Sequence, residues 1–456
     1  MSGAIVGRFQ AIYPPFNWPL AARTGRRTRP TDVSAAPQTA TPVPSYLAPR
    51  VAAVVAPYTD EGHAREFARL GWQQIAVLLG PGLLPAGAAP EVHGEFARTV
   101  LHDGGLRRTV RQLRMHQVRA VVAGSPMGVA LAERLARELE LPGNDPASTP
   151  ARCDLGAQTK ALAEHGITAP RMLHTTSLTE AQEWTRFCAL PTYEVAPADT
   201  GVEVRARVCR TAQEIAEAWQ SVSGALPRRG GRRPALVIRE YLPGRRYVVH
   251  SLSGRGEDGT PEHTVTDAWA QSFTATGELD RMDLMSRHGL LPRVLSLYVL
   301  QVLGALEVST GPLRCEIAYL PERGPVLLNA RAFPEISAAG HCARTALGSD
   351  AFRDAAHAAI FDRSRRPVRS PGPLHLTRIR LLPTADGVLD RWLLRTITTL
   401  PTVTHADSTL MARAEVRSGV CPGEIVLRSS DEGAIEADFR VIRAVERLGL
   451  YEGARS

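Results

Sequence analysis

Apolar and polar residues in the first third of the chain are arranged as expected for strands that alternate with helices. Residues 51–57 (VAAVVAP) form a short run of β-branched and small apolar residues, which is typical of a buried strand. Apolar residues with helical spacing follow at 61–71, and a second apolar run follows at 73–80. The same order recurs with a helix, a strand and a helix, expected at 106–116, 118–124 and 128–140. This alternation predicts a parallel sheet covered by helices.

The rest of the chain mixes helices with strands and hairpins. Further helices are expected at 158–165, 179–189, 211–224, 291–306, 349–361 and 431–449. Strands are expected at 234–253, at 259–272 and in a hairpin of two buried strands within 311–340. The segment after residue 365 is rich in predicted strand, and no internal repeat is visible. Together these patterns predict a multidomain protein of mixed α/β and α+β class.

The composition narrows the class of protein without naming an activity. With 456 residues, 44% hydrophobic and 22% charged, the chain is typical of a globular protein with several domains. No apolar run reaches about 18 residues and the N-terminus lacks a signal-peptide core, so we expect no membrane partner and a cytoplasmic location. The six cysteines have no metal-ligand spacing. The net charge of +8 is spread over scattered arginines, so a nucleic-acid partner is not favoured.

One compositional feature bears directly on chemistry. The chain contains a single lysine, Lys160, so 53 of its 54 basic residues are arginine. An arginine guanidinium binds carboxylates and phosphates in a planar, two-pronged way, whereas a lysine supplies a compact point charge. Any site that needs a lysine ammonium on a phosphate is therefore restricted to Lys160.

Several segments together resemble a known family. They are VVAGSPMGVALAERLARELELPGNDP, ITAPRMLHTTSLTEA, REYLPGRRYVV, VTDAWA, GPLRCEI and GPVLLNARAF, in this order between residue 51 and the C-terminus. In this order they resemble ATP-grasp carboxylate–amine ligases of the L-amino-acid-ligase type. The resemblance implies an ATP-grasp architecture with a disordered or extended arm (1–48), an N-terminal α/β domain (49–147), a lid-like subdomain (148–250), a second subdomain with the metal-type hairpin (251–364) and a small C-terminal cap (365–456).

The resemblance also implies a mechanism and a set of functional positions. In the family, ATP phosphorylates a carboxylate and an amine then displaces the phosphate. Two lysines and a glycine-rich loop hold the phosphates, two acids carry Mg²⁺, and an arginine steadies the transferred group. In this chain Leu155 and Ala196 stand at the two lysine positions, and the loop is shortened to ADTG with the single glycine Gly201. Lys160 lies about 140° around the predicted helix from Leu155, so we expect it at the surface.

The adenine hinge and the metal hairpin supply the candidate site residues. In REYLPGRRYVV the cofactor-binding candidates are Glu240, Tyr241, Leu242 and Arg246, the last of which stands where the family has a ribose-binding glutamate. The favoured alternative is that Glu240 and Arg246 form an exposed ion pair on the strand. In the hairpin the metal candidates are Glu316 and Asn329. Asn329 stands at the position of the family's second acid. If the register is shifted, Glu335 takes that position in place of Asn329.

The same hairpin carries the one catalytic candidate. Arg331 stands where the family has an asparagine, and we expect it to be catalytic only if the protein is active. Asp267 and Trp269 match the strand that leads into the family's amino-acid pocket, where Trp269 lines either the pocket or the core.

Two interpretations of these departures remain open. In the first, the protein is a degenerate or repurposed ligase of a small-molecule or peptide pathway that binds an anionic or amino-acid ligand, or a partner enzyme, without ordinary ATP chemistry. Arg239, Arg246 and Arg331 are then the expected anion ligands. In the second, it is an active ATP-dependent ligase with an altered site, and only then are ATP and Mg²⁺ expected. A homodimer is compatible with either.

Overall fold

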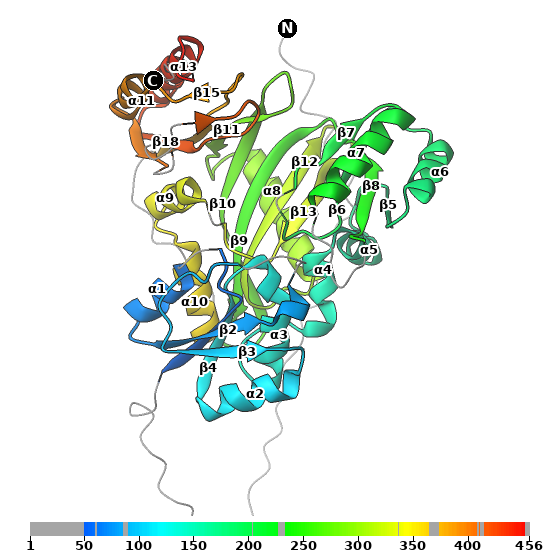
Figure 1. Ribbon diagram of the computed structural model, residues 1–456, viewed down its shortest axis with the longest axis vertical. Coiled ribbons are helices and arrows are strands. Elements are labelled where there is room, and N and C mark those ends of the chain that lie inside the picture. The colour runs from blue at the N-terminus through cyan, green and yellow to red at the C-terminus, as the bar shows by residue number, and fades with distance from the viewer. Residues whose placement is uncertain are drawn as a thin grey trace, which may run out of the picture. The chain divides into compact units, whose positions relative to one another are not determined.

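The computed structural model describes residues 50–59, 62–84, 90–202, 204–226, 233–335, 337–363, 374–407, 410 and 415–451. The arm expected at 1–48 lies outside these residues. The described residues form three main sheets, drawn in Figure 1. None of the described helices is long and apolar enough to cross a membrane.

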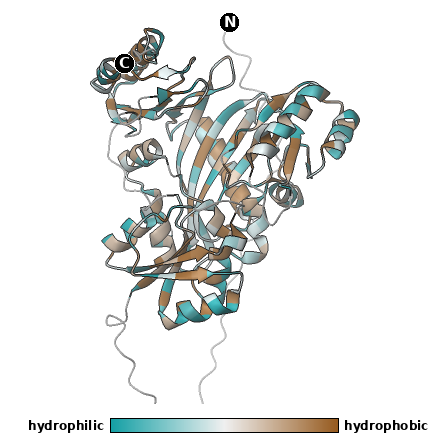
Figure 2. Cartoon of the chain, in the orientation of Figure 1, coloured by the Kyte–Doolittle hydropathy of each residue, from teal (hydrophilic) through white to brown (hydrophobic). Residues whose placement is uncertain are grey.

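The first sheet is parallel, as the alternating pattern predicts. Its strands are β1 (Val51–Val55), β2 (Gln73–Leu79), β3 (Arg98–His102) and β4 (Val118–Ala123), in the order β3-β2-β1-β4. The helices that connect them are α1 (Gly62–Arg69), α2 (Leu106–Met115) and α3 (Val129–Glu138). Strand β3 was not expected, because only Val100 and His102 of its five residues are buried. Figure 2 shows this sheet as mostly hydrophobic, as expected of strands with helices on both faces.

The second sheet is antiparallel and includes the segment expected to be a lid. Its strands are β5 (Met172–Thr175), β6 (Tyr193–Pro197), β7 (Arg207–Cys209) and β8 (Leu236–Glu240), in the order β5-β8-β6-β7. The helices α6 (Leu178–Cys188) and α7 (Ala212–Ala225) pack against it and share a core with Tyr193 and Trp219. Helix α7 begins with a capping box, in which Thr211 and Glu214 satisfy each other's backbone N–H groups.

The third sheet is the largest and carries the hairpin. Its order is β13-β12-β9-β10-β11-β14-β18-β16. The bounds are β9 (Arg245–Arg255), β10 (Pro261–Phe273), β11 (Leu279–Leu284), β12 (Gly311–Leu320), β13 (Gly324–Arg331), β14 (His375–Arg380), β16 (Val403–Ala406) and β18 (Glu424–Ser429). The expected boundary at residue 250 therefore falls inside β9, and three strands of the expected C-terminal cap extend this sheet.

Helices cover both faces of the large sheet. Helix α8 (Leu290–Ala305) packs on one face against Ile317 and Leu327. Helix α9 (Ala338–Ala346), which the sequence pattern did not predict, packs on the other face against Val248 and Trp269. The remaining elements of the C-terminal region are β15 (Gly387–Val388), α11 (Arg391–Thr398), β17 (Glu415–Val416) and α13 (Glu432–Arg447), and their core is continuous with β14 and β18.

Helix α10 (Ala351–Phe361) packs against α1 and β4. The contact is close: a Cβ atom on Gly62 would lie 2.4 Å from the ring of Phe352. Glycine is therefore required where α1 meets α10, because any side chain would overlap the aromatic ring.

A buried arginine ties the first sheet to the third. Arg152, on α4 (Thr149–Cys153), donates to both carboxylate oxygens of Glu133 at 2.9 and 2.8 Å and to the carbonyl oxygen of Leu306 at 2.9 Å. The Arg152 side chain is fully buried, and the two-pronged pair with Glu133 satisfies the charge of both groups. The positions of α3 and α8 are therefore coupled through one ion pair.

Candidate functional site

Strands β9, β12 and β13 bring together four residues that the sequence singled out, Arg246, Glu316, Asn329 and Arg331, and add Arg314 to them. In the register of β12 and β13, Glu316 lies opposite Asn329 and Arg314 lies opposite Arg331. Strand β9 pairs on the other side of β12 and places Arg246 opposite Ala318, two positions from Glu316 along the strand. Side chains two apart on a strand point to the same face, so this pairing gathers three arginines around one carboxylate.

The electrostatics of this group are dominated by the arginines. Arg314 forms an ion pair with Glu316. Burial raises the pKa of Glu316, but Arg314, Arg331 and Arg246 outweigh burial and lower the pKa to about 2. Glu316 is therefore ionised at neutral pH, and three guanidinium charges face one carboxylate. The excess of positive charge favours an anion at this place.

Two buried polar atoms of the hairpin have unused hydrogen-bonding capacity within the described part of the chain. The Asn329 Oδ1 atom and the Arg331 Nε atom are buried without a hydrogen-bond partner. Arg331 donates only a long bond of 3.5 Å, from Nη2 to the carbonyl oxygen of Val202. One acceptor and one donor therefore remain for a bound molecule beside the charge cluster.

The hinge residues do not form the exposed ion pair that was the alternative to cofactor binding. Glu240 is buried, accepts a hydrogen bond from the Arg171 N–H at 3.0 Å and pairs with Arg323 at 2.9 Å. Arg246 lies over the ring of Tyr241, with 5.8 Å between its Cζ atom and the ring centroid. The expected exposed pair between Glu240 and Arg246 is wrong, because each has a different partner.

The remaining hinge candidate, Leu242, is buried in an apolar cluster with Ala318, Val326 and Leu328. Its side chain therefore packs against the β12–β13 hairpin.

The two residues that the resemblance places at the family's lysine positions are apolar and buried. Leu155, the first residue of α5 (Leu155–Glu164), and Ala196 on β6 are buried in one apolar cluster with Ala198 and Val237. Lys160 is exposed on the next turns of α5, with its Nζ atom 3.9 Å from Glu164. The expectation of a surface lysine is confirmed.

The backbone N–H groups of the shortened loop donate hydrogen bonds to acceptors within the protein. The Ala198 N–H donates to the Ala235 carbonyl at 3.1 Å, and the Thr200 N–H donates to the Cys153 carbonyl at 3.0 Å. The Gly201 N–H donates to Asp199 Oδ1 at 2.8 Å. A phosphate-binding loop needs several N–H groups pointing at the ligand, and these three already have acceptors.

One of the expected anion ligands is engaged elsewhere. Arg239 is buried and donates from Nε to Glu194 Oε2 at 2.8 Å and from Nη1 to the Leu328 carbonyl at 2.6 Å. The expectation that Arg239 belongs to the anion site is therefore wrong, because Arg239 joins β8 to β6 and β13. Arg314 lies beside Arg246 and Arg331 instead.

The residues present do not fit a magnesium site of the family type. Among the described residues there is no group of three or more His, Cys, Asp or Glu side chains that could hold a metal ion. Glu316 is neutralised by arginine, and Glu335, the alternative acid, pairs with Arg378 at 2.8 Å. Mg²⁺ is usually held by one or two free carboxylates together with phosphate oxygens. Neither acid of the hairpin is free for that role.

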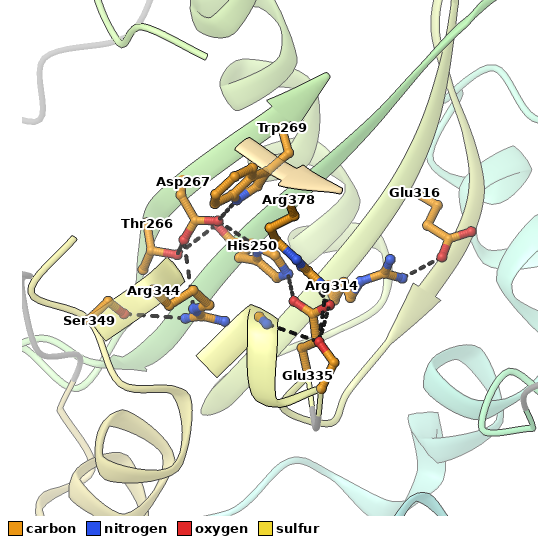
Figure 3. A network of polar contacts seen from close by, with 12 residues as sticks. His250, Thr266, Asp267, Trp269, Arg314, Glu316, Glu335, Arg344, Ser349 and Arg378 are labelled. Carbon is orange, nitrogen blue, oxygen red and sulfur yellow. Dashed lines mark hydrogen bonds and ion pairs between the residues drawn. The ribbon is translucent and has the colours of Figure 1, made fainter. Parts of the chain in front are cut away.

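Beside the arginine cluster lies a chain of buried charges, drawn in Figure 3, that the sequence did not indicate. His250 on β9 contacts Asp267 on β10 at 2.5 Å, and its Nε2 atom lies 3.6 Å from Glu335. Glu335 pairs with Arg378 on β14, which also pairs with Glu424 on β18 at 2.7 Å. The members come from five separate segments, so no local spacing reveals them.

This chain of charges also settles the place of the aromatic residue. Trp269 donates from Nε1 to Asp267 Oδ1 at 2.7 Å and is 1% exposed under helix α9. Its side chain belongs to the core, which is one of the two placements expected.

Burial raises the pKa of Glu335, but Arg378, His250 and Arg314 outweigh it and lower that pKa to about 2.

The fold defined by these sheets is that of the ATP-grasp carboxylate–amine ligases, in agreement with the sequence resemblance. An L-amino acid ligase from Bacillus licheniformis superposes with a TM-score of 0.68 and 15% identity, over 87% of this chain and 97% of that structure. The N5-carboxyaminoimidazole ribonucleotide synthetase purK, in its ADP complex, superposes with a TM-score of 0.61 and 12% identity, over 87% and 98%.

Sequence relatives point in the same direction over a shorter span. Dapdiamide A synthase from Enterobacter agglomerans is 22% identical over 232 residues, which cover 51% of this chain and 54% of that protein. The uncharacterized protein y4rH from Sinorhizobium fredii is 25% identical over 203 residues, 43% of this chain and 42% of that protein. The chain thus spans about half the length of the curated relatives it matches. No protein-family model matches the sequence.

Proposed function

We propose that this protein uses the ATP-grasp fold to bind a small anionic or amino-acid-type ligand directly through arginines, without phosphoryl transfer from Mg·ATP. The observation that carries the proposal is the cluster of Arg246, Arg314 and Arg331 around the carboxylate of Glu316. A guanidinium can hold a carboxylate or phosphate in a two-pronged hydrogen bond and needs no metal ion to do so.

The unused atoms specify the ligand further. The Arg331 Nε–H is a donor suited to an anionic oxygen, and Asn329 Oδ1 is an acceptor suited to an N–H or O–H group. A ligand with a carboxylate or phosphate next to an amine or hydroxyl satisfies both. An α-amino acid has this arrangement, and so does a phosphate monoester of a small diol or amino alcohol.

Three features argue against the family's Mg·ATP chemistry in this chain. The two lysine positions form an apolar cluster, the loop amides have internal acceptors, and both hairpin acids are paired with arginine. A phosphate placed against Leu155 and Ala196 would lose its hydration without gaining a charged partner, which is strongly unfavourable. These three features are independent of one another, so one compensating substitution does not restore the site.

The second candidate is an active ATP-dependent carboxylate–amine ligase with an altered site. It is favoured by the names of the neighbours and by the unpaired Asn329 Oδ1 beside Glu316, since amide and carboxylate oxygens are ligands that Mg²⁺ accepts. In this candidate Glu316 must leave Arg314 to reach a cation. The alanine variant of Glu316 then loses all turnover.

Calorimetric titration of the full chain with pyrophosphate, L-aspartate, ADP and ATP tests the two candidates. Under the proposal, at least one anion binds equally well with Mg²⁺ and with EDTA. The Arg331→Met variant then weakens binding about 10- to 100-fold, because a hydrogen bond to a charged group is lost. The control is Arg293→Met, which changes an exposed arginine on α8, on the other face of the sheet.

The opposite results are equally clear. Binding of ATP that requires Mg²⁺, together with phosphate release that Glu316→Ala abolishes, supports the active ligase and overturns the proposal. Absence of binding by every anion overturns it as well.

A further inference from the structure

A cavity of about 90 Å³ lies at the free edge of strand β4, and none of the residues of the arginine cluster lines it. Strand β4 ends its sheet in the described part of the chain, and the start of β12 and the residues after β13 line the cavity there. Its walls are largely apolar and include Val121, Ala132 and Phe333. Its polar lining comes from His63, Glu133, Asn144 and Thr310.

Two of these polar residues are fully engaged. Glu133 is held by Arg152 and Thr149. The Asn144 side chain accepts from the N–H groups of Ser309 at 2.8 Å and Thr310 at 3.0 Å, and donates to Glu133 at 3.2 Å. These contacts hold the loop before β12 against α3, and they leave Glu133 and Asn144 with little capacity for a ligand.

The other two polar residues, His63 and Thr310, have unused hydrogen-bonding capacity. Both ring nitrogens of His63 and the hydroxyl of Thr310 are buried without a hydrogen-bond partner among the described residues. The exposed fractions of the two residues are 2% and 8%. Buried polar groups in proteins are nearly always satisfied, so three unsatisfied atoms lining one cavity indicate an occupant that hydrogen-bonds to them.

The His63 ring is positioned by packing. It meets the ring of Phe352 edge-on at 4.9 Å between centroids and that of Phe333 at 6.3 Å. Burial lowers the pKa of His63 to about 4, although the Asp350 carboxylate acts in the opposite direction. At neutral pH the ring is therefore uncharged, with one N–H donor and one nitrogen acceptor. An ion in this cavity would lack a counter-charge, because Glu133 is already paired.

We propose that this cavity binds a small uncharged molecule carrying a hydroxyl or carboxamide group, which hydrogen-bonds to both His63 and Thr310. The volume of about 90 Å³ is well above the ~10–15 Å³ that a single water needs, so the cavity has room for a small organic molecule. Because Thr310 leads into β12 and Phe333 follows β13, the occupant braces the base of the hairpin against α1.

The test uses the full chain labelled with ¹³C-histidine and titrated with acetamide, which is neutral, and with acetate, which has the same number of heavy atoms and a charge. His63→Gln identifies the His63 ring signal, and exposed His165 serves as the internal reference. We expect acetamide to shift the His63 signal saturably, with a dissociation constant in the millimolar range, and acetate to leave it unchanged. Thr310→Val keeps the shape and removes the hydroxyl, so it weakens acetamide binding about five- to tenfold.

A crystal soaked in acetamide then shows the amide between His63 and Thr310. The proposal is overturned if acetate and acetamide act alike, if neither shifts the His63 signal, or if the soaked crystal holds only water in the cavity. The comparison of acetamide with acetate in the unmodified chain keeps the test valid if Thr310→Val fails to fold.

Discussion

The buried acid Glu335 makes a prediction whose size follows from its surroundings. Its side chain is 13% exposed and pairs with Arg378, which is 4% exposed, while His250 lies on its other side at 3.6 Å. These neighbours lower the pKa of Glu335 from 4.5 to about 2 in the folded protein. Such a difference in pKa corresponds to about 3 kcal/mol of folding free energy at neutral pH.

The variant Glu335→Gln removes this charge and keeps the shape. Because the pKa is depressed in the folded state, the stabilisation is complete above about pH 4.5 and disappears as the pH falls towards about 2. We therefore expect the variant to lose about 3 kcal/mol at pH 7. For a cooperative unit of about 400 residues, this lowers the melting temperature by about 3–4 °C. At the acid end of the window the variant and the unmodified protein should unfold alike.

Thermal and urea unfolding of both proteins across this pH range measures the difference directly. Other carboxyl groups titrate in both proteins, so the comparison isolates Glu335. Glu183→Gln, on the exposed surface of α6, is the matched control and should change nothing. A loss of stability that stays constant from pH 7 to the acid end would refute the reasoning, since a charge interaction must vanish when the carboxyl is protonated. No loss at pH 7 would refute it too.

Three further predictions concern other parts of the molecule. Glu316→Gln removes an acid that faces the three arginines, so it should tighten anion binding in calorimetry; weaker binding would show that Glu316 itself holds the ligand. Arg152→Met leaves Glu133 buried without its cation and should lower the free energy of unfolding by about 3–5 kcal/mol in urea titrations, whereas a near-zero change would mean that Glu133 finds another partner. Gly62→Ala forces a Cβ atom against Phe352 and should cost about 1–3 kcal/mol by the same measurement, unless α1 can move away from α10.

The comparison of sequence and structure is clearest in the first and last thirds of the chain. The apolar runs at β1, β2 and β4 and the helical spacing of α13 are strong local patterns, and they predicted these elements. Strand β3 and helix α9 were missed, since β3 has only two buried residues and α9 begins with the small residues Ala338, Ala339 and Gly340. Small residues give weak hydrophobic periodicity, and their burial is decided by what packs over them.

For the candidate site, too, some features can be predicted from the sequence and others are seen only in the structure. That Leu155 and Ala196 stand where the resemblance expects lysines can be read directly from the sequence. Which arginines remain available to bind a ligand cannot be read from the sequence. Arg239 is paired with Glu194, whereas the strand register places Arg314 opposite Arg331 in the cluster.

By itself, the sequence determined the order of elements, the ATP-grasp resemblance and the identity of the hairpin residues, because these depend on local pattern and on residue type. Only the tertiary structure decided which charges are paired. Glu335, which follows β13, meets Arg378 on β14, and His250 on β9 meets Asp267 on β10. Pairing of buried charges depends on distances of a few ångströms between separate segments, and no spacing within one segment records them.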